Sequence, residues 1–247
     1  MSDRVPVEIF PGEVFANTTD FDTGIRQLIP YYDEMLATIA RCIPVSAERV
    51  LELGCGTGEL SVKLLQNCPQ ATVIALDYSP RMLEYARGKI EATGYGKRWR
   101  GIVMDFGAWT AGETAQGIGS GFDACASSLA IHHLVNPMKL KLFERIRASL
   151  NPGGSFWNAD PVAIESPALS DVYQSVREAW ASDCGTTLAQ VRTKMGQSNP
   201  YGYSSQDQLA TLEEHWQMLK AAGFESVSVP WKYFGLAVFG GFVPKSD

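Results

Sequence analysis

Three glycines within five positions, Gly54, Gly56 and Gly58, follow the apolar residues at the start of VLELGCGTGEL (50–60). Glycine lets the backbone turn tightly and approach a ligand, and the N-terminus of a following helix favours negative charge. Asp77 ends a second apolar stretch, TVIALD, 19 residues after Gly58. An acidic side chain at that interval binds ribose hydroxyls in nucleoside-binding βαβ units. The two features together predict a nucleoside site, and the alternative for Asp77 is a cap on the next helix.

The glycine spacing limits which nucleotide this site could bind. The sequence has G-x-G-x-G with Glu52 two residues ahead of the first glycine, whereas the dinucleotide fingerprint is G-x-G-x-x-G. The loop also contains no lysine of the kind that binds nucleoside triphosphates. A dinucleotide and a triphosphate are therefore both disfavoured.

The elements that must position these residues alternate between strands and helices. Apolar runs predict strands at 50–54, 72–77, 101–106, 122–130 and 154–160, with amphipathic helices between them. This order predicts an α/β fold with a mostly parallel, doubly wound sheet and helices on both faces. A helical pattern at 24–43, divided at Pro30, precedes the sheet, and two strand-like stretches close the chain.

Four segments are expected along the 247 residues. They are an N-terminal helical segment over the site (1–45), the nucleoside-binding core (46–161), a helical cap (162–221) and the final strands (222–247). Sixty residues of helical pattern are more than one crossover between strands needs, so the third segment is expected to cover the site.

Composition and charge limit the classes of protein to which this chain could belong. The formal charge of −6 argues against a broad nucleic-acid surface, although Lys97, Arg98 and Arg100 could form a local basic patch. The five cysteines are scattered and lack any C-x-x-C or Cys/His spacing, so neither a metal site nor a disulfide framework is expected. Residues 1–13 lack a basic stretch followed by an apolar one, and no apolar run reaches membrane-spanning length, so we expect no signal peptide and a soluble cytoplasmic protein with no membrane partner. The sequence leaves a homodimer open.

Five motifs in order resemble those of the class I methyltransferases that use S-adenosylmethionine. They are ELGCGTG (52–58), ALDYSPRML (75–83), VMDF (103–106), FDACASSLAIHHL (122–134) and LNPGGSFWNAD (150–160), together covering about 110 residues. The resemblance implies a Rossmann-like sheet of seven strands whose last strand is antiparallel. It also implies S-adenosyl-L-methionine as cofactor and S-adenosyl-L-homocysteine as product.

The resemblance also implies a role for each matching residue. The loop from Gly54 through Cys55 and Gly56 to Gly58 would face the methionine part and the ribose edge of the cofactor, with Glu52 ahead of it. Asp77 would bind the ribose, and Asp105 would accept from the adenine amino group. Three apolar or aromatic side chains would pack around adenine, namely Tyr78, Met82 and Phe106, although each could equally be core. Ser128 would lie near the sulfonium.

Two outer stretches, IPYYDEML (29–36) and the C-terminal HWQMLKAAGFESV…WKYFGLAVFGG, resemble a narrower group. That group contains small-molecule methyltransferases and relatives of the carboxy-S-adenosylmethionine synthases of wobble-uridine tRNA modification. By this resemblance Tyr32 would reach the methionine carboxylate. Arg192 is the one arginine that could correspond to the synthase arginine holding the extra carboxylate, and surface solvation is the alternative.

His132 and His133 are the candidates for a general base, because the resemblance places the end of the fourth strand beside the methyl group. Two of the chain's three histidines stand there. The alternative is that they only cap or pack a helix start. Asp160, after the fifth strand, could orient the acceptor or pair with a histidine. Three aromatic residues of the cap could line an acceptor pocket, namely Trp180, Tyr201 and Tyr203.

Three functions remain open at this stage. The first is a methyltransferase acting on a small molecule, which the inserted cap and the acidic charge favour. The second is an RNA-modifying enzyme, either a wobble-uridine methyltransferase or a carboxy-S-adenosylmethionine synthase-like enzyme. The third is a non-catalytic module that binds S-adenosylmethionine. No NPPY-type tetrapeptide follows the fourth strand, which disfavours methylation of a planar amine.

Overall fold

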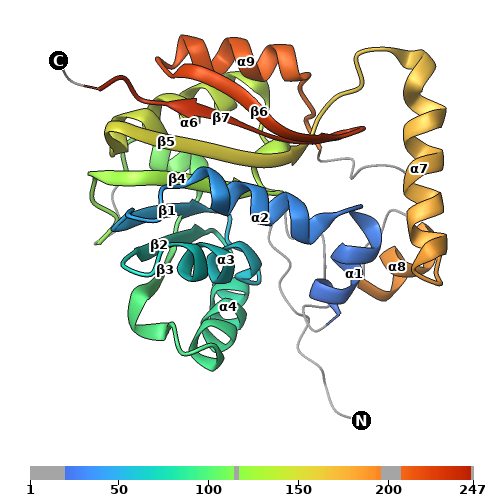
Figure 1. The fold of residues 1–247 in the computed structure, drawn as a ribbon, viewed down its shortest axis with the longest axis horizontal. Coiled ribbons are helices and arrows are strands. Elements are labelled where there is room, and N and C mark those ends of the chain that lie inside the picture. The colour runs from blue at the N-terminus through green and yellow to red at the C-terminus, as the bar shows by residue number, and fades with distance from the viewer. Residues whose placement is uncertain (1–19, 114–116, 196–206, 246–247) are drawn as a thin grey trace.

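A computed structural model describes residues 20–113, 117–195 and 207–245 of the chain. Its centre is a seven-stranded sheet in the order β3-β2-β1-β4-β5-β7-β6 (Figure 1). The β1–β2, β1–β4, β2–β3 and β4–β5 pairs are parallel, and β7 runs antiparallel to both of its neighbours. The predicted doubly wound sheet with an antiparallel last strand is confirmed.

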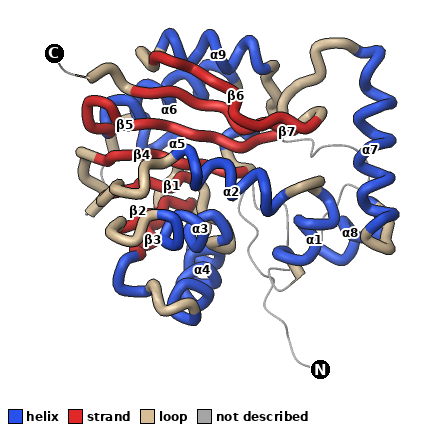
Figure 2. The backbone as a smooth tube through the Cα atoms, in the orientation of Figure 1, coloured by secondary structure: helices blue, strands red, loops and turns tan. Residues whose placement is uncertain are grey.

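Helices and strands alternate through most of the described chain (Figure 2). The strands are β1 (Arg49–Leu53), β2 (Thr72–Asp77), β3 (Trp99–Val103), β4 (Phe122–Ser128), β5 (Leu150–Pro161), β6 (Glu225–Tyr233) and β7 (Leu236–Phe242). The α-helices are α1 (Phe21–Leu28), α2 (Tyr32–Cys42), α3 (Glu59–Asn67), α4 (Pro80–Ala92), α5 (Phe106–Thr110), α6 (Asn136–Ser149), α7 (Ser170–Asp183), α8 (Leu188–Met195) and α9 (Leu212–Ala221).

Local sequence accounts for several helix starts. The Ser79 hydroxyl accepts a hydrogen bond from the Met82 amide at 3.2 Å, and Pro80 occupies the first turn of α4, where its missing N–H is not needed. Thr211 and Glu214 form a reciprocal capping box that starts α9. These caps fix where two helices begin relative to the ends of their neighbouring strands.

The sheet is covered on both faces, because successive side chains of its strands point to opposite sides. Val50 belongs to a core cluster that includes residues of α2, α3 and α4, whereas the next residue, Leu51, belongs to a second cluster that includes residues of α6 and α9. α1, α7 and α8 continue the first layer beyond the sheet and lie together at one side of it (Figure 1). α9 packs against α6 and β6, so of the α-helices described in the segment 162–221 it is α7 and α8 that stand away from the sheet.

Some expected boundaries differ from those observed. The third strand runs from Trp99 to Val103, and Asp105 and Phe106 instead begin α5, because the Asp105 side chain caps that helix. β5 begins at Leu150, four residues before the expected start at 154, so it includes Asn151, Pro152 and Gly153. The break at Pro30 is present, since α1 ends at Leu28 and α2 begins at Tyr32. Within the described ranges, no helix is long and apolar enough to cross a membrane.

Candidate active site

The three loop glycines have different neighbours, although all have positive φ angles between 50° and 83°. A Cβ at Gly54 would overlap the Cβ of Ala130, and one at Gly58 would lie 3.1 Å from the Cβ of Ala86 on α4. A Cβ at Gly56 would meet no atom within 4 Å. Gly54 and Gly58 are therefore needed for packing within the protein, and Gly56 is the glycine that faces open space.

Asp77 holds this loop in place. One carboxylate oxygen accepts a hydrogen bond from the Gly56 amide at 2.8 Å, and the other accepts from the Ser79 amide at 2.9 Å. The side chain thus joins the end of β2 both to the glycine loop and to the start of α4. A carboxylate oxygen has two lone pairs and can accept more than one hydrogen bond.

Glu52 lies beneath the loop and not in its open space. Its side chain is 1% exposed and accepts a hydrogen bond from the Ser61 hydroxyl, which in turn accepts from the Trp99 indole N–H at 2.9 Å. Burial, together with the nearby Asp77 carboxylate, raises the pKa of Glu52 to about 8. The observed contacts of Glu52 therefore connect β1, α3 and β3. Cys55 is also buried, and burial raises the pKa of its thiol.

The expected adenine-side residues line the ends of β2 and β3. One oxygen of Asp105 accepts from the Ala108 amide at 3.0 Å, and the residue is exposed to solvent. The Phe106 ring reaches back to the glycine loop, 3.5 Å from where a Gly54 Cβ would be. Met82 is buried and Tyr78 is half-buried. Phe106 and the loop are thus brought together from different strands.

A strained turn follows β4. Leu129 has a φ of 53°, a left-handed conformation that a residue with a side chain rarely adopts, and its amide donates to the Ala159 carbonyl at 2.8 Å. The Ser128 hydroxyl just before it is buried and has no hydrogen-bond partner among the described residues. A buried hydroxyl without a partner is costly, which suggests that a ligand group completes this position.

The structure pairs His132 with Asp160. The His132 Nδ1 atom lies 2.7 Å from a carboxylate oxygen of Asp160, and the Asn158 amide donates to the other oxygen at 2.8 Å. His132 is 7% exposed, and both Asp160 and Asn158 are fully buried. The arrangement fixes the imidazole by its Nδ1 atom and directs Nε2 away from Asp160.

The pKa of Asp160 reflects two opposing effects. Burial raises it, but attraction to His132 and the hydrogen bonds from His132 and Asn158 outweigh burial and hold it below its ordinary value. His215 lies in the same buried region, against Phe239 and Phe143, and burial lowers its pKa to about 4. Asp160 is thus charged at neutral pH and His215 is neutral.

Asp207 joins the two histidines and was not anticipated from the sequence. Its carboxylate oxygen lies 3.2 Å from His133 Nδ1 and 3.6 Å from His132 Nε2. The adjacent Gln208 amide donates to the His132 carbonyl at 2.8 Å, and the Lys139 ammonium donates to the Gln208 carbonyl. Asp207 is 74 residues from His133 in a polar stretch, so spacing gave no signal for it.

A network of charged side chains fastens α1 over the glycine loop. The Thr57 hydroxyl in the loop donates to Asp22 at 2.7 Å, and Lys89 on α4 forms ion pairs with Asp22 and Glu59. Arg26 contacts both Asp33, at 2.8 Å, and Glu59. These ion pairs and the hydrogen bond from Thr57 hold the N-terminal helices over the loop.

Tyr32 lies beneath the same network, at the start of α2. It is buried, and the Arg26 guanidinium stands 5.3 Å above its ring. Burial and the neighbouring Glu59 carboxylate raise the pKa of the phenol well above its ordinary value, so Tyr32 stays protonated and keeps a hydrogen to donate.

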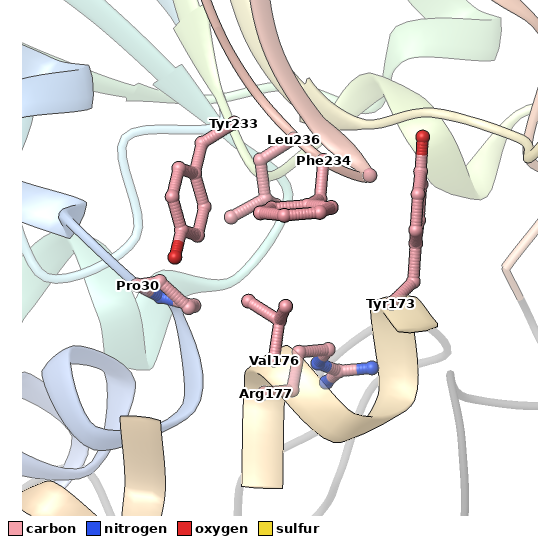
Figure 3. Close-up of a pocket in the computed structure, with 8 residues that line it drawn as sticks. Pro30, Tyr173, Val176, Arg177, Tyr233, Phe234 and Leu236 are labelled. Atoms are coloured by element: carbon pink, nitrogen blue, oxygen red, sulfur yellow. The ribbon is translucent and has the colours of Figure 1, made fainter. Parts of the chain in front are cut away.

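Trp180 attaches α7 to the N-terminal helices. Its indole N–H donates to the Arg26 carbonyl at 2.8 Å, and its ring lies 4.9 Å from that of Tyr31, which also contacts Tyr233. Beside this contact, α7 and the β6–β7 turn enclose a pocket lined by Pro30, Tyr173, Val176, Arg177, Tyr233, Phe234, Gly235 and Leu236 (Figure 3). Its cavity volume of about 20 Å³ has room for a water molecule and not for an acceptor.

Two expected acceptor residues, Tyr201 and Tyr203, lie outside the described residues. Arg192 on α8 is 3% exposed, so the alternative of a solvated surface arginine is wrong. α8 packs closely on α1, where Met195 would obstruct any side chain at Gly24. Arg192 is thus buried in the cap, on a helix that contacts the cover of the glycine loop.

The residues present fit S-adenosylmethionine. The open space at Gly56, the Asp77 carboxylate and the Ser128 hydroxyl, which has no partner among the described residues, border the carboxyl ends of β1, β2 and β4. Ligands bind there in open parallel sheets. The fold and this site define a class I S-adenosylmethionine-dependent methyltransferase.

Comparison with known proteins agrees with this class. Residues 50–154 match the methyltransferase domain family. A carboxy-S-adenosyl-L-methionine synthase from Nautilia profundicola is 23% identical over 230 residues, covering 90% of each protein. A ubiquinone/menaquinone biosynthesis C-methyltransferase from Dinoroseobacter shibae is 26% identical over 194 residues, covering 78% of this chain and 73% of that protein. The chain is an enzyme of the S-adenosylmethionine-dependent methyltransferase class.

Solved structures share the fold. An O-methyltransferase family protein from Burkholderia thailandensis superposes with a TM-score of 0.65 at 15% identity, covering 93% of this chain and 60% of that one. The mitomycin 7-O-methyltransferase superposes with a TM-score of 0.58 at 17% identity, covering 84% of this chain and 52% of that one. This chain therefore spans about half to 60% of the length of those structures.

Proposed function

We propose that this enzyme transfers a methyl group to a hydroxyl or other protonated group of a small molecule, and that His132 removes the acceptor's proton. The observation that carries the proposal is the 2.7 Å contact between His132 Nδ1 and Asp160 at the ends of β4 and β5. An imidazole fixed through Nδ1 by a buried carboxylate can accept a proton at Nε2, because the carboxylate stabilises the resulting charge.

The cofactor, when bound, supplies an electrophilic methyl group for in-line displacement. The protein's main contribution is alignment, which can supply roughly 7–11 kcal/mol when the reacting atoms are held at near-attack distance. Proton removal by a placed base adds about 10²–10⁴-fold. His132, His133 and Asp160 are the proposed catalytic group. Their convergence argues against a module that only binds the cofactor.

We assign cofactor contacts to residues that border the open space of the loop. Asp77 is the proposed ribose ligand, Asp105 the adenine ligand, and Tyr32 the donor to the methionine carboxylate. The other proposed contacts are Gly54, Cys55, Gly56, Gly58, Tyr78, Met82, Phe106 and Ser128. Glu52 acts on the cofactor indirectly in this proposal, since its carboxyl group is buried against Ser61.

Three observations favour a small acceptor over a nucleic acid. The formal charge is −6, and α1, α7 and α8 stand together beside the carboxyl ends of the strands (Figure 1). The network over the loop carries no net positive charge, because Asp22, Asp33 and Glu59 balance Arg26, Lys63 and Lys89. A cover without net positive charge would not attract the phosphates of a nucleic acid. The five free cysteines are consistent with a cytoplasmic site of action.

A substrate screen tests this proposal. Purified enzyme is incubated with S-adenosylmethionine and panels of small phenols, hydroxy acids, thiols and amines, and S-adenosylhomocysteine release is measured. We expect release with a subset of one chemical class, and a fall of at least 100-fold with His132→Gln. Release only with tRNA would contradict the small-molecule proposal.

A carboxy-S-adenosylmethionine synthase-like activity is the second candidate. The buried Arg192 favours it, because a guanidinium in the cap suits an extra carboxylate on the cofactor, and the synthase from Nautilia profundicola matches along 90% of the chain. Mass spectrometry of ligand released from freshly purified protein tests this candidate. A carboxylated S-adenosylmethionine that is lost in Arg192→Gln would support it, and its absence from active wild-type enzyme would exclude it.

A further inference from the structure

The two adjacent histidines and Asp207 form a cluster that base catalysis alone does not explain. One ligand atom from each of His132, His133 and Asp207 lies within 4.8 Å of the others, which is the only such group of three among residues 20–113, 117–195 and 207–245. The Asp207 oxygen is 3.2 Å from His133 Nδ1 and 3.6 Å from His132 Nε2. A single proton-transfer base would need only one of these imidazoles.

These separations match those between ligands of one metal ion. Ligand atoms about 2.1 Å from an ion lie about 3.0 Å apart in octahedral and about 3.4 Å apart in tetrahedral geometry. Both separations from Asp207 fall near these values. The His132 and His133 rings, whose centroids are 4.0 Å apart, present Nε2 of the first and Nδ1 of the second to the same oxygen.

One nitrogen of the cluster, His133 Nδ1, lacks a hydrogen-bond partner among the described residues, as expected of an atom that binds a metal ion. His133 Nδ1 is buried and makes no hydrogen bond to any described residue, although it is only 3.2 Å from the Asp207 oxygen. In the tautomer with its hydrogen on Nε2, His133 therefore has a lone pair on Nδ1 that no described residue engages. A buried polar atom without a partner is expected to be satisfied by a missing ion or water.

A second layer of hydrogen bonds orients the proposed ligands. Asp160 engages His132 Nδ1, so Nε2 is left for an ion, and Asn158 holds Asp160 in turn. Histidine ligands of metals regularly donate their other nitrogen to a carboxylate in this way. Gln208, bonded to the His132 carbonyl and to Lys139, fixes the backbone beside Asp207.

We propose that His132 Nε2, His133 Nδ1 and Asp207 bind one divalent first-row transition-metal ion, such as Zn²⁺ or Fe²⁺. Two imidazoles and one carboxylate suit such an ion better than Mg²⁺ or Ca²⁺, which prefer oxygen ligands. Three protein ligands leave one coordination position open in a tetrahedral site and three in an octahedral site. These positions take an oxygen atom of the methyl acceptor, a part of the inference that rests on the proposed function.

Metal binding would change how the acceptor loses its proton. An oxygen bound to the ion becomes more acidic, so the O–H bond breaks and the proton passes to solvent before the methyl arrives. The oxygen then forms the bond to the methyl carbon as the carbon–sulfur bond breaks. His132 Nε2 is then a metal ligand, so the ion replaces His132 as the group that promotes proton loss, and the acceptor is a phenol, enol or hydroxy acid able to coordinate an ion.

The site is tested first with Co²⁺ alone on chelator-treated full-length protein. Calorimetry and visible absorption are expected to show one site per chain below about 10 µM, with the d–d bands of nitrogen ligation. Asp207→Asn and His133→Gln should each weaken Co²⁺ binding at least tenfold. His215→Leu removes the chain's only other histidine and should leave Co²⁺ affinity unchanged.

Two controls separate this proposal from its alternatives. S-adenosylhomocysteine affinity, measured on the same variants, should not change, which shows that each variant is folded. The site would be overturned if the wild-type protein bound neither Co²⁺ nor Zn²⁺ up to about 100 µM. It would also be overturned if Asp207→Asn and His133→Gln bound Co²⁺ as tightly as wild type. If metal binds but activity is unaffected by chelation, the acceptor role fails and the metal site stands. If no acceptor is found, Co²⁺ binding still decides the site.

Discussion

The Asp77 carboxylate accepts a hydrogen bond from the Gly56 amide at 2.8 Å, so the residue expected to bind ribose also holds the glycine loop. Gly56 is the loop glycine whose α-hydrogens face open space, and Asp77 is 5% exposed directly behind it. The two proposed roles are therefore coupled. Loss of the carboxylate would remove both the acceptor of ribose hydroxyls and the restraint on the loop.

Asp77→Ala should weaken S-adenosylhomocysteine binding by at least tenfold in calorimetry, because it removes a charged hydrogen-bond acceptor from the site. Ser79→Ala is the matched control. It removes the cap of the same helix, lowers unfolding free energy by about 1 kcal/mol and leaves cofactor affinity nearly unchanged. Unchanged affinity in Asp77→Ala would exclude the ribose assignment.

Gly56→Ala and Gly54→Ala should separate cofactor binding from folding. An alanine at position 56 meets no protein atom, so its φ of 50° should cost only about 1 kcal/mol while the methyl group blocks the cofactor. An alanine at position 54 would overlap Ala130, so the fold itself should lose several kcal/mol. Thermal unfolding and calorimetry on both variants measure the two effects. Normal cofactor binding by Gly56→Ala would show that the cofactor lies elsewhere.

Glu52 should make the protein less stable as pH rises from about 5 to 8. Its pKa is about 8 in the folded state, against 4.5 ordinarily, so the folded protein holds a proton that the unfolded chain releases. Stability contributed by the protonated form is complete below pH 4.5 and falls by up to about 1.4 kcal/mol per pH unit until pH passes 8. Glu52→Gln cannot release a proton and still accepts from Ser61.

The Glu52 prediction is checked by the melting temperature at several pH values. The difference between Glu52→Gln and wild type should be small at pH 5 and grow in favour of the variant toward pH 8. Parallel curves for the two proteins would show that the carboxyl group is not held neutral in the folded state.

Trp180→Ala should loosen α7 from the N-terminal helices. It removes the hydrogen bond to the Arg26 carbonyl and the ring contact with Tyr31, whereas Trp180→Phe removes only the hydrogen bond. We expect an unfolding free energy lower by about 3 kcal/mol for alanine and about 1 kcal/mol for phenylalanine. Denaturant unfolding measures both values. Equal stability of all three proteins would show that this contact does not hold the cap.

The sheet could be predicted because its signals are local. Each parallel strand is a short apolar run, and both faces are buried, so the pattern of 50–54 or 72–77 needs no knowledge of distant residues. The glycine loop and Asp77 follow from the order of these strands. The end of the third strand was misplaced because Asp105 caps a five-residue helix, and so short a helix has no periodicity to detect.

The residues proposed to lie around the methyl acceptor could be predicted from the sequence only in part. His132 follows β4 and Asp160 lies at the end of β5, and these strands are neighbours in the sheet, so their contact follows from topology. Asp207 reaches them from within the segment 162–221, between α8 and α9, and nothing in its neighbourhood marks it as a ligand. The burial of Arg192 was equally hidden, because it depends on how α8 packs on α1. Long-range packing of irregular segments leaves no periodic pattern in a single sequence.

The contact between His132 and Asp160 leads to the sharpest test of catalysis. His132→Ala should lower kcat by about 10²–10⁴-fold, because it removes the group that takes up or directs the acceptor's proton. Asp160→Asn keeps the shape of the side chain but removes the charge that orients His132 Nδ1, and it should lower kcat by a smaller factor. The double variant should be no slower than His132→Ala, because Asp160 acts through the histidine. S-adenosylhomocysteine affinity should stay within about twofold in all three variants. If Asp160→Asn alone matches wild type, or if the two effects multiply, the residues do not act as a pair.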